Sequence, residues 1–406
     1  MGFQQGLAGL NAAARNLDVI GNNVANTNTV GFKSARAEFA DVYATTVYGV
    51  GNATPGIGVS VADLAQQFTQ GDLTTTHNSL DVAINGSGFF RMSEGGSITY
   101  TRNGQFQLDK DGYIVNSNGA RLTGYPVDQN GVVNNGVPQD LRLDTSDIPP
   151  RTTSAARVTI NLDARTAVPT TPFDVTDGSS YNGGSSVSVY DSLGREHALA
   201  MYFRKTGDNS WEVHATSDGV AIAGGPIGTL SFNTDGSLNQ AASTIPMNVM
   251  VPVGTDAGGT QAVAVSMPSA TQFGADFSVS ELRQDGFAAG RLAGFSVGRD
   301  GAILSRYTNG ETLPRGKISL ANFTNPQGLQ SIGGNQWAET ADSGPPLVGS
   351  AGAGSLGVLQ SGALESSNVD LTAELVNMIT AQRVYQANAQ TIRTHDQLLQ
   401  TIVNLR

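Results

Sequence analysis

The sequence predicts a multidomain protein that is mainly β and carries long α-helical termini. Its 406 residues exceed what one ordinary domain usually holds. Apolar residues recur at helical spacing only near the two ends of the chain. Between the ends, short segments alternate Val, Ile, Thr or aromatic residues with polar ones, and Gly, Asn and Asp separate them. We therefore expect a nested architecture, in which terminal helices enclose an inner β domain and that domain encloses an inserted outer β domain.

The N-terminal segment, residues 1–28, is expected to form an amphipathic helix. Its larger apolar residues recur with steps of four and three or their sums, which is typical of a coiled-coil stripe. They are Phe3, Leu7, Leu10, Leu17 and Val24.

The C-terminal segment, residues 366–406, predicts a second and longer helix. Apolar residues fall every seven positions there, and a further leucine widens the stripe. These residues are Leu371, Met378, Tyr385, Ile392 and Leu399, with Leu375 beside them. Ser367 and Asp370 have capping-box spacing just before the run. We expect the terminal helices to pair as a coiled coil and to carry subunit contacts, because a long exposed apolar stripe is costly in water. An intramolecular stalk or a plain dimeric coiled coil is the alternative.

The middle of the chain predicts two β domains. Asn-Gly or Asp-Gly pairs, which favour hairpin turns, recur at Asn103, Asp111, Asn130, Asp235 and Asp300. Composition shifts place an inner β domain at 71–145 with 286–365, an outer β domain at 146–285, and a connecting segment at 29–70. Linkers are expected near 147–154 and 270–286, where they would let the outer domain tilt as a rigid body.

Composition excludes several classes of function. The chain has 23 basic and 34 acidic residues and a net charge of −11, so nucleic acid is excluded as the main partner. It has no Cys, which excludes disulfides and thiolate metal sites. No apolar run is long enough to span a bilayer, so we expect no membrane insertion. The N-terminus has no basic region followed by an apolar core, and no cleaved signal peptide is expected.

No catalytic constellation emerges from the residues. His77, His197, His214 and His395 have no metal-ligand spacing to one another. The Gly-rich stretch at 352–357 matches a dinucleotide-binding pattern, but it lacks the flanking strand and helix. We therefore expect no enzyme activity, no cofactor and no metal.

Two segments resemble the signatures of the flagellar rod and hook axial protein family. The first has an Asn-Asn-x-Ala-Asn core followed by Gly-Phe-Lys. The second begins at Ser367 and runs to the C-terminus. The residues that carry the resemblance are Asn22, Asn23, Ala25, Asn26, Gly31, Phe32 and Lys33, together with Asn368, Asp370, Gln382 and Arg383. Residues 79–90, 100–106 and 111–115 are similar to the inner β domain of the same family.

The inserted segment favours the hook branch of that family. Residues 187–194, 202–203 and 211–213 resemble the outer domain of hook proteins. The resemblance implies a subunit of a curved tubular homopolymer that transmits torque from rod to filament as a universal joint. The alternatives are a distal rod protein, which would be expected to lack a large insert, and a secreted β-rich adhesin, which would leave the two signatures unexplained.

The resemblance also implies partners and a location. The partners would be other copies of the chain, the distal rod protein, the hook–filament junction protein, the hook cap or scaffold protein, and the flagellar type III export apparatus. The location would be extracellular, in the hook of the flagellum, after export without a cleaved signal peptide. Residues 39–43, Phe39 to Tyr43, are a candidate for the segment that the export apparatus recognises.

Overall fold

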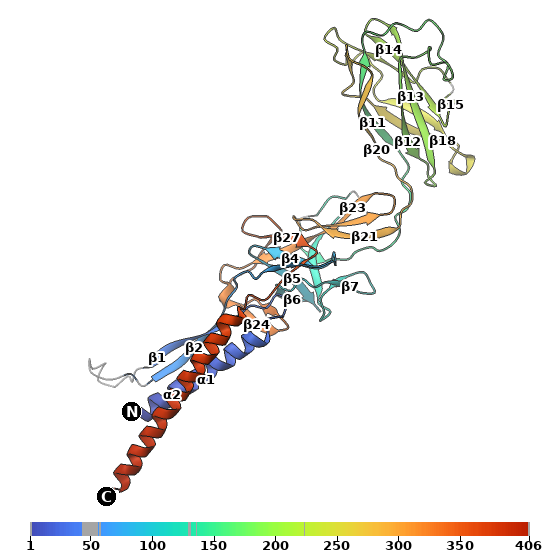
Figure 1. Cartoon of the computed structure of the whole chain (residues 1–406). Coiled ribbons are helices and arrows are strands. Elements are labelled where there is room, and N and C mark those ends of the chain that lie inside the picture. Colours follow the sequence, from blue (N-terminus) through green and yellow to red (C-terminus); the bar gives the residue numbers. More distant parts are fainter. Residues whose placement is uncertain are drawn as a thin grey trace. The chain divides into compact units, whose positions relative to one another are not determined.

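The computed structural model describes residues 2–42, 56, 58–128, 131–134, 136–222 and 224–404. The chain forms two compact units (Figure 1). The first unit comprises Met1–Thr145, Gly294–Arg306 and Thr312–Arg406, and the second comprises Ser146–Ala293 and Tyr307–Glu311. The second unit is thus inserted in the sequence of the first, and the protein is mainly β with two α-helices in its described part.

The first unit contains both helices. Helix α1 spans Gly2–Ala25 and helix α2 spans Leu371–Asn404, and the two lie side by side (Figure 1). An antiparallel hairpin of β1 (Ala35–Val42) and β2 (Gly58–Gln66) packs against α1. The predicted connecting segment therefore holds a two-stranded sheet of its own.

The rest of the first unit is a β body. Two short pairs close it near the helices, β3 (Leu73–Thr75) with β28 (Ala363–Glu365) and β4 (Val82–Asn85) with β27 (Val358–Ser361). A twelve-stranded sheet has the main order β21-β22-β23-β9-β5-β6-β25-β24, and β7, β8, β10 and β26 pair off this path. Its strands are β5 (Phe89–Glu94), β6 (Ser97–Thr101), β7 (Gln107–Leu108), β8 (Ile114–Val115), β9 (Arg121–Pro126), β10 (Gln139–Asp140), β21 (Leu292–Val297), β22 (Ala302–Tyr307), β23 (Thr312–Asn322), β24 (Gln330–Gly333), β25 (Gln336–Ala338) and β26 (Leu347–Ser350). A short 3-10 helix, η2 (Pro326–Gly328), precedes β24.

Aromatic side chains fill part of the β body's core. Phe89, Tyr100, Phe323 and Trp337 are buried and meet edge to face, with ring centroids 4.8–6.0 Å apart. Such edge-to-face pairs add to the stabilisation from apolar burial. Strands β5 and β6 supply Phe89 and Tyr100 to this aromatic cluster.

The second unit packs two five-stranded sheets against each other. One contains β11 (Ala155–Asp163), β17 (Met247–Pro252), β18 (Thr260–Ser266), β19 (Thr271–Phe273) and β20 (Ser278–Gln284), and the other contains β12 (Gly183–Tyr190), β13 (Glu196–Gly207), β14 (Ser210–Ser217), β15 (Val220–Ala221) and β16 (Gly228–Ser231). A 3-10 helix, η1 (Thr255–Ala257), lies between β17 and β18. Alternate residues point into one core, in which Trp211 and Phe203 are fully buried. This alternation is what two sheets packed face to face require.

The predicted linker at 270–286 is wrong, whereas the one at 147–154 lies just after the division between the units. Residues 270–286 contain β19 and β20, which pair with β11. Within 147–154, Ile148 bridges to Gly290 and Arg151 bridges to Phe287. The Pro- and Thr-rich stretch at 147–154, which predicted a linker, therefore contains residues whose backbone is paired. The units divide after Thr145, where the sequence placed the start of the outer domain, and again after Ala293, whereas the sequence placed the second boundary at 285/286.

One predicted hairpin turn also needs correction. Gly104 does not adopt the left-handed conformation of a hairpin turn, whereas the glycines after Asp111, Asn130, Asp235 and Asp300 do. The backbone oxygen of Gly104 instead accepts a hydrogen bond from the Val82 N–H at 3.0 Å. Within the described residues, neither helix is apolar enough along its length to cross a bilayer.

Candidate functional site

Helices α1 and α2 run antiparallel and approach each other closely at two glycines. A Cβ atom at Gly6 would lie 3.0 Å from Ile392 Cγ1, and one at Gly9 would lie 2.9 Å from the Asn388 side-chain oxygen. Nearer the β body, the Asn23 side-chain amide donates to Glu374 Oε1 at 3.2 Å. Small and polar residues thus set part of the intramolecular helix contact, because larger side chains would push the helices apart.

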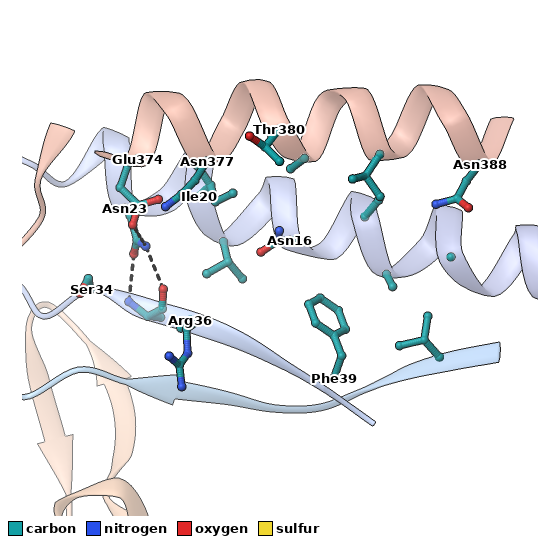
Figure 2. Close-up of a pocket in the computed structure, with 18 of the residues that line it drawn as sticks. Asn16, Ile20, Asn23, Ser34, Arg36, Phe39, Glu374, Asn377, Thr380 and Asn388 are labelled. Atoms are coloured by element: carbon teal, nitrogen blue, oxygen red, sulfur yellow. Dashed lines mark hydrogen bonds between the residues drawn. The ribbon is translucent and has the colours of Figure 1, made fainter. Parts of the chain in front are cut away.

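A groove of about 680 Å³ opens between α1, α2 and the β1–β2 hairpin. Figure 2 shows Phe39 rising from β1 toward α1, which carries Asn16, whereas Asn377 of α2 lies nearer Asn23. Asn23 joins the wall of the groove to the hairpin, since its amide group donates to the Ala35 oxygen at 2.8 Å and accepts from the Ala35 N–H at 3.0 Å. The groove therefore mixes amide and apolar groups and resembles a helix-packing surface more than a substrate pocket.

The predicted interface residues divide into two groups. Leu7, Leu371, Leu375, Tyr385 and Leu399 are exposed. Leu10, Leu17, Val24, Met378 and Ile392 are half-buried. The side chain of Phe3 lies outside the described residues, as does Tyr43 of the candidate export segment.

Helix α2 also exposes apolar residues that the seven-residue spacing missed. Val376 and Ile379 are 58% and 52% exposed, and Leu398 is 54% exposed. The missed signal is the four-residue step from Leu371 to Leu375 to Ile379, which places these three side chains along one face. We call Leu371, Leu375, Val376 and Ile379 the apolar patch of α2.

A fully buried group of charges ties the roots of both helices to the β body. Glu365 Oε1 lies 2.6 Å from Lys33 Nζ, and Glu365 Oε2 lies 3.1 Å from Arg102 NH1. Glu365 is 1% exposed, Lys33 is 2% exposed and Arg102 is 4% exposed. Burial lowers the pKa of Lys33 and that of Arg102, while the Glu365 carboxylate opposes both shifts. We call Lys33, Arg102 and Glu365 the ion cluster.

Backbone groups add three hydrogen bonds to the ion cluster, although Arg102 Nε is buried without a hydrogen-bond partner. Lys33 Nζ donates to the Thr69 oxygen at 2.7 Å, Arg102 NH2 donates to the Gly86 oxygen at 2.9 Å, and the Gly71 N–H donates to Glu365 Oε1 at 3.0 Å. Four stretches of chain, far apart in sequence, therefore meet at one carboxylate.

Other signature residues cluster around the same junction. Gly31 has a φ of 69°, and its N–H donates to the backbone oxygen of Glu365 at 2.8 Å. Asn368 accepts from the Ser34 N–H at 2.8 Å and donates to the Gln67 oxygen at 2.7 Å. These interactions give Gly31, Lys33, Asn23 and Asn368 a shared structural role at the helix roots.

The remaining signature residues have local roles or none that the fold explains. Asn26 donates to the Asn22 oxygen at 2.9 Å at the end of α1. Asp370 Oδ1 accepts from the N–H groups of Thr372 and Ala373, so Asp370 caps α2. The predicted capping box with Ser367 as the cap is wrong by three residues. Phe32 is half-buried, and its backbone oxygen accepts from the Asn368 N–H at 3.5 Å. Ala25, Gln382 and Arg383 are exposed, and the described part of the chain shows no structural reason for their place in the signature.

The second unit holds a buried carboxylate that organises a turn. Burial alone raises the pKa of Asp191, but hydrogen bonds from the Arg195 and Leu193 N–H groups and from the Arg195 guanidinium outweigh it and lower the pKa to about 2. His197 Nε2 lies 3.5 Å from Asp191 Oδ2, and His197 Nδ1 lies 2.8 Å from Asp218 Oδ2. In the described part of the chain, no cluster of three or more His, Cys, Asp or Glu residues could hold a metal ion.

Comparisons with known proteins show which family the chain belongs to. Matching family models are described as "Flagella basal body rod protein" at residues 3–33, "Flagellar hook protein FlgE/F/G D1 domain" at 83–165, "Flagellar basal body protein FlaE D2 domain" at 161–287 and "Flagellar basal body rod FlgEFG protein C-terminal" at 360–405. The flagellar hook protein FlgE of Escherichia coli (strain K12) is 44% identical over 415 residues, and both chains are fully covered. The chain belongs to the flagellar hook protein family.

More distant hook proteins match over nearly the same length. The FlgE of Borreliella burgdorferi is 32% identical over 440 residues and covers 99% of this chain and 98% of its own. A crystal structure of Helicobacter pylori flagellar hook protein FlgE2 shares the fold, with a TM-score of 0.54 and 14% identity over 72% of this chain and 100% of that chain. The protein is accordingly a structural subunit of the bacterial flagellar hook. Full-length hook relatives favour this assignment over the distal rod protein and the adhesin.

Proposed function

We propose that this hook subunit polymerises chiefly through its terminal helices, and that the apolar patch of α2 is the main contact with a second copy. The proposal rests on the solvent exposure of the apolar side chains of this patch. Leu371 and Leu375 are each 44% exposed, and Val376 and Ile379 more so, although they lie on an ordered helix. Leu7, Tyr385 and Leu399 add exposed apolar groups, and the half-buried Leu10, Leu17, Val24, Met378 and Ile392 support the pairing of α1 with α2.

The energy available fits a polymer contact. Burying a leucine or isoleucine side chain completely contributes roughly 1.5–3 kcal/mol, so covering the half-exposed patch contributes about half of that for each residue. Each subunit in a tube would repeat this gain along the polymer. Heterologous contacts that do not close into a ring give helical assemblies.

The β domains would allow the tube to bend. Only 14% of the residues are charged and 50 are Gly, so most polar groups of the chain are uncharged. Small, wet and replaceable contacts let neighbouring subunits approach or separate at little cost. We propose that helix packing transmits torque and that the inner and outer β domains, predicted at 71–145 with 286–365 and at 146–285, accommodate bending.

The proposed partners follow from the ends of the chain. Models of rod proteins match residues 3–33 and 360–405, which supports end-to-end contact with a distal rod protein. The hook–filament junction protein and the hook cap or scaffold protein would meet the same helices at the other end of the tube. We propose export through the flagellar type III apparatus without a cleaved signal peptide, with Phe39, which is exposed on β1, as part of the recognised segment.

A polymerisation assay tests the proposal. The double variant Leu375→Ser/Ile379→Ser should form at least tenfold less sedimentable tube than the wild-type chain at equal concentration, with an unchanged unfolding midpoint. Gln390→Ser, at an exposed polar position of the same helix, controls for the lower helix propensity of Ser. Wild-type assembly by the double variant would show that the patch is not the main contact.

A further inference from the structure

The ion cluster joins parts of the chain that are far apart in sequence. Lys33 closely follows α1, which ends at Ala25, and Glu365 closely precedes α2, which begins at Leu371. Arg102 follows β6 in the β body. The cluster is therefore complete only when both ends of the chain have been brought to the β body.

The ion cluster carries a net positive charge, so its stability depends on which of its three side chains is present. Two cations face one buried carboxylate, and Arg102 also lies 5.4 Å from the centre of the Phe89 ring. Removing one partner of a buried ion pair leaves an uncompensated charge and is strongly destabilising. Loss of the Glu365 carboxylate would leave two cations together without a counter-charge, whereas loss of the Lys33 ammonium would leave a balanced pair of Arg102 and Glu365.

The backbone around the cluster leaves no room for displacement. A Cβ atom at Gly31 would lie 2.6 Å from the Asn103 nitrogen, and one at Gly71 would lie 2.1 Å from the Ser366 oxygen. Asn335 donates to the Val30 oxygen at 2.9 Å. The segments that lead into both helices are thus pressed against the β body beside the ion cluster.

We propose that Lys33, Arg102 and Glu365 are positioning residues for assembly, which fix the direction and register in which α1 and α2 leave the β body. A subunit whose two ends are not both attached would then fail to present the apolar patch of α2 in the geometry that a second copy accepts. This inference rests on the proposed function. The cluster itself touches no second copy in the proposal and acts only through the helices.

Hydrogen exchange of the full-length monomer, read by mass spectrometry, tests the proposal separately from assembly. In Lys33→Met, amides of residues 23–42 should exchange at least tenfold faster, while those of β5 and β6 keep their protection because Arg102 and Glu365 remain paired. In Glu365→Gln, amides of residues 371–381 should also exchange at least tenfold faster. Glu38→Gln, which removes the carboxylate of an exposed pair with Arg36, should change neither.

Tube formation by the same variants completes the test. Lys33→Met should extend the lag of polymerisation at least tenfold although its apolar patch is intact. Three results would each overturn the positioning role. The first is an unchanged exchange rate at residues 23–42 in Lys33→Met, and the second is an equal loss of protection in β5, β6 and the helices. The third is polymerisation at the wild-type rate by a variant whose helix amides exchange faster. Failure of the proposed function looks different, because Leu375→Ser/Ile379→Ser would then assemble normally while the monomer's exchange stays at the wild-type rate.

Discussion

Gly31 shows how a single residue can join a helix to a β body. Its φ of 69° suits glycine, and its Cα faces the backbone of Arg102 and Asn103 without room for a side chain. The position therefore has two independent reasons to exclude a Cβ atom, one from conformation and one from space.

Gly31→Ala should destabilise the first unit by more than about 2 kcal/mol, because left-handed strain and a backbone clash add together. Gly95 has a φ of 58° with nothing near its Cβ direction, so Gly95→Ala should cost only about 1–2 kcal/mol. Denaturant unfolding of both variants measures the difference. Equal losses would show that the close approach at Gly31 is unimportant.

Asp191 makes the stability of the second unit depend on pH. Its pKa in the folded chain is about 2, below the ordinary value of 3.8. A lowered carboxyl pKa stabilises the fold above the ordinary value, and that contribution is lost as the pH falls from about 3.8 to about 2. Asp191→Asn should therefore lower the unfolding midpoint at pH 7, and the gap to the wild-type chain should narrow toward pH 2. Asp208→Asn, at an exposed position, is the control. A gap that is constant with pH would contradict this account.

At the scale of elements, α2 depends on its cap and on its short connection to the ion cluster. Asp370 accepts two N–H groups of the first turn, at 2.9 and 3.1 Å. Ser367 accepts only from the Val369 N–H, outside the helix, at 3.4 Å. The helix therefore begins three residues later than the capping box predicted.

Asp370→Ala should cost about 1 kcal/mol and should fray the first turn of α2, whereas Ser367→Ala should leave the helix unchanged. Hydrogen exchange at residues 372–376 reports the fraying. The opposite order of effects would restore Ser367 as the cap.

The sequence predicted the two helices better than the surfaces they use. Heptad spacing located α1 and α2 because period is a property of one element alone. It could not separate the half-buried Met378 from the exposed Ile379, since that distinction depends on where α1 and the hairpin lie. The ion cluster was also out of reach, because Lys33, Arg102 and Glu365 are far apart in sequence and each looks like a surface residue on its own.

At the scale of the whole molecule, turn residues in the sequence indicated that one β unit is inserted in another. The start of the insert, after Thr145, lies where the sequence placed it, but its end lies after Ala293 and not at 285/286. Pro- and Thr-rich stretches look alike in a linker and in an edge that pairs through single bridges, such as Ile148 with Gly290. Family resemblance supplied the function. The exposure of Leu375 and Ile379 is the observation on which the proposed subunit contact of this chain rests.

The central claim is that the apolar patch of α2 is covered when subunits assemble, and maleimide labelling tests it most directly. The chain has no Cys, so Ile379→Cys creates a single reactive thiol, and Val137→Cys, at a position that is 77% exposed, serves as the reference. The account predicts that Ile379→Cys reacts readily in the monomer and at least tenfold more slowly in the assembled tube. Equal labelling rates at position 379 in monomer and tube would contradict it.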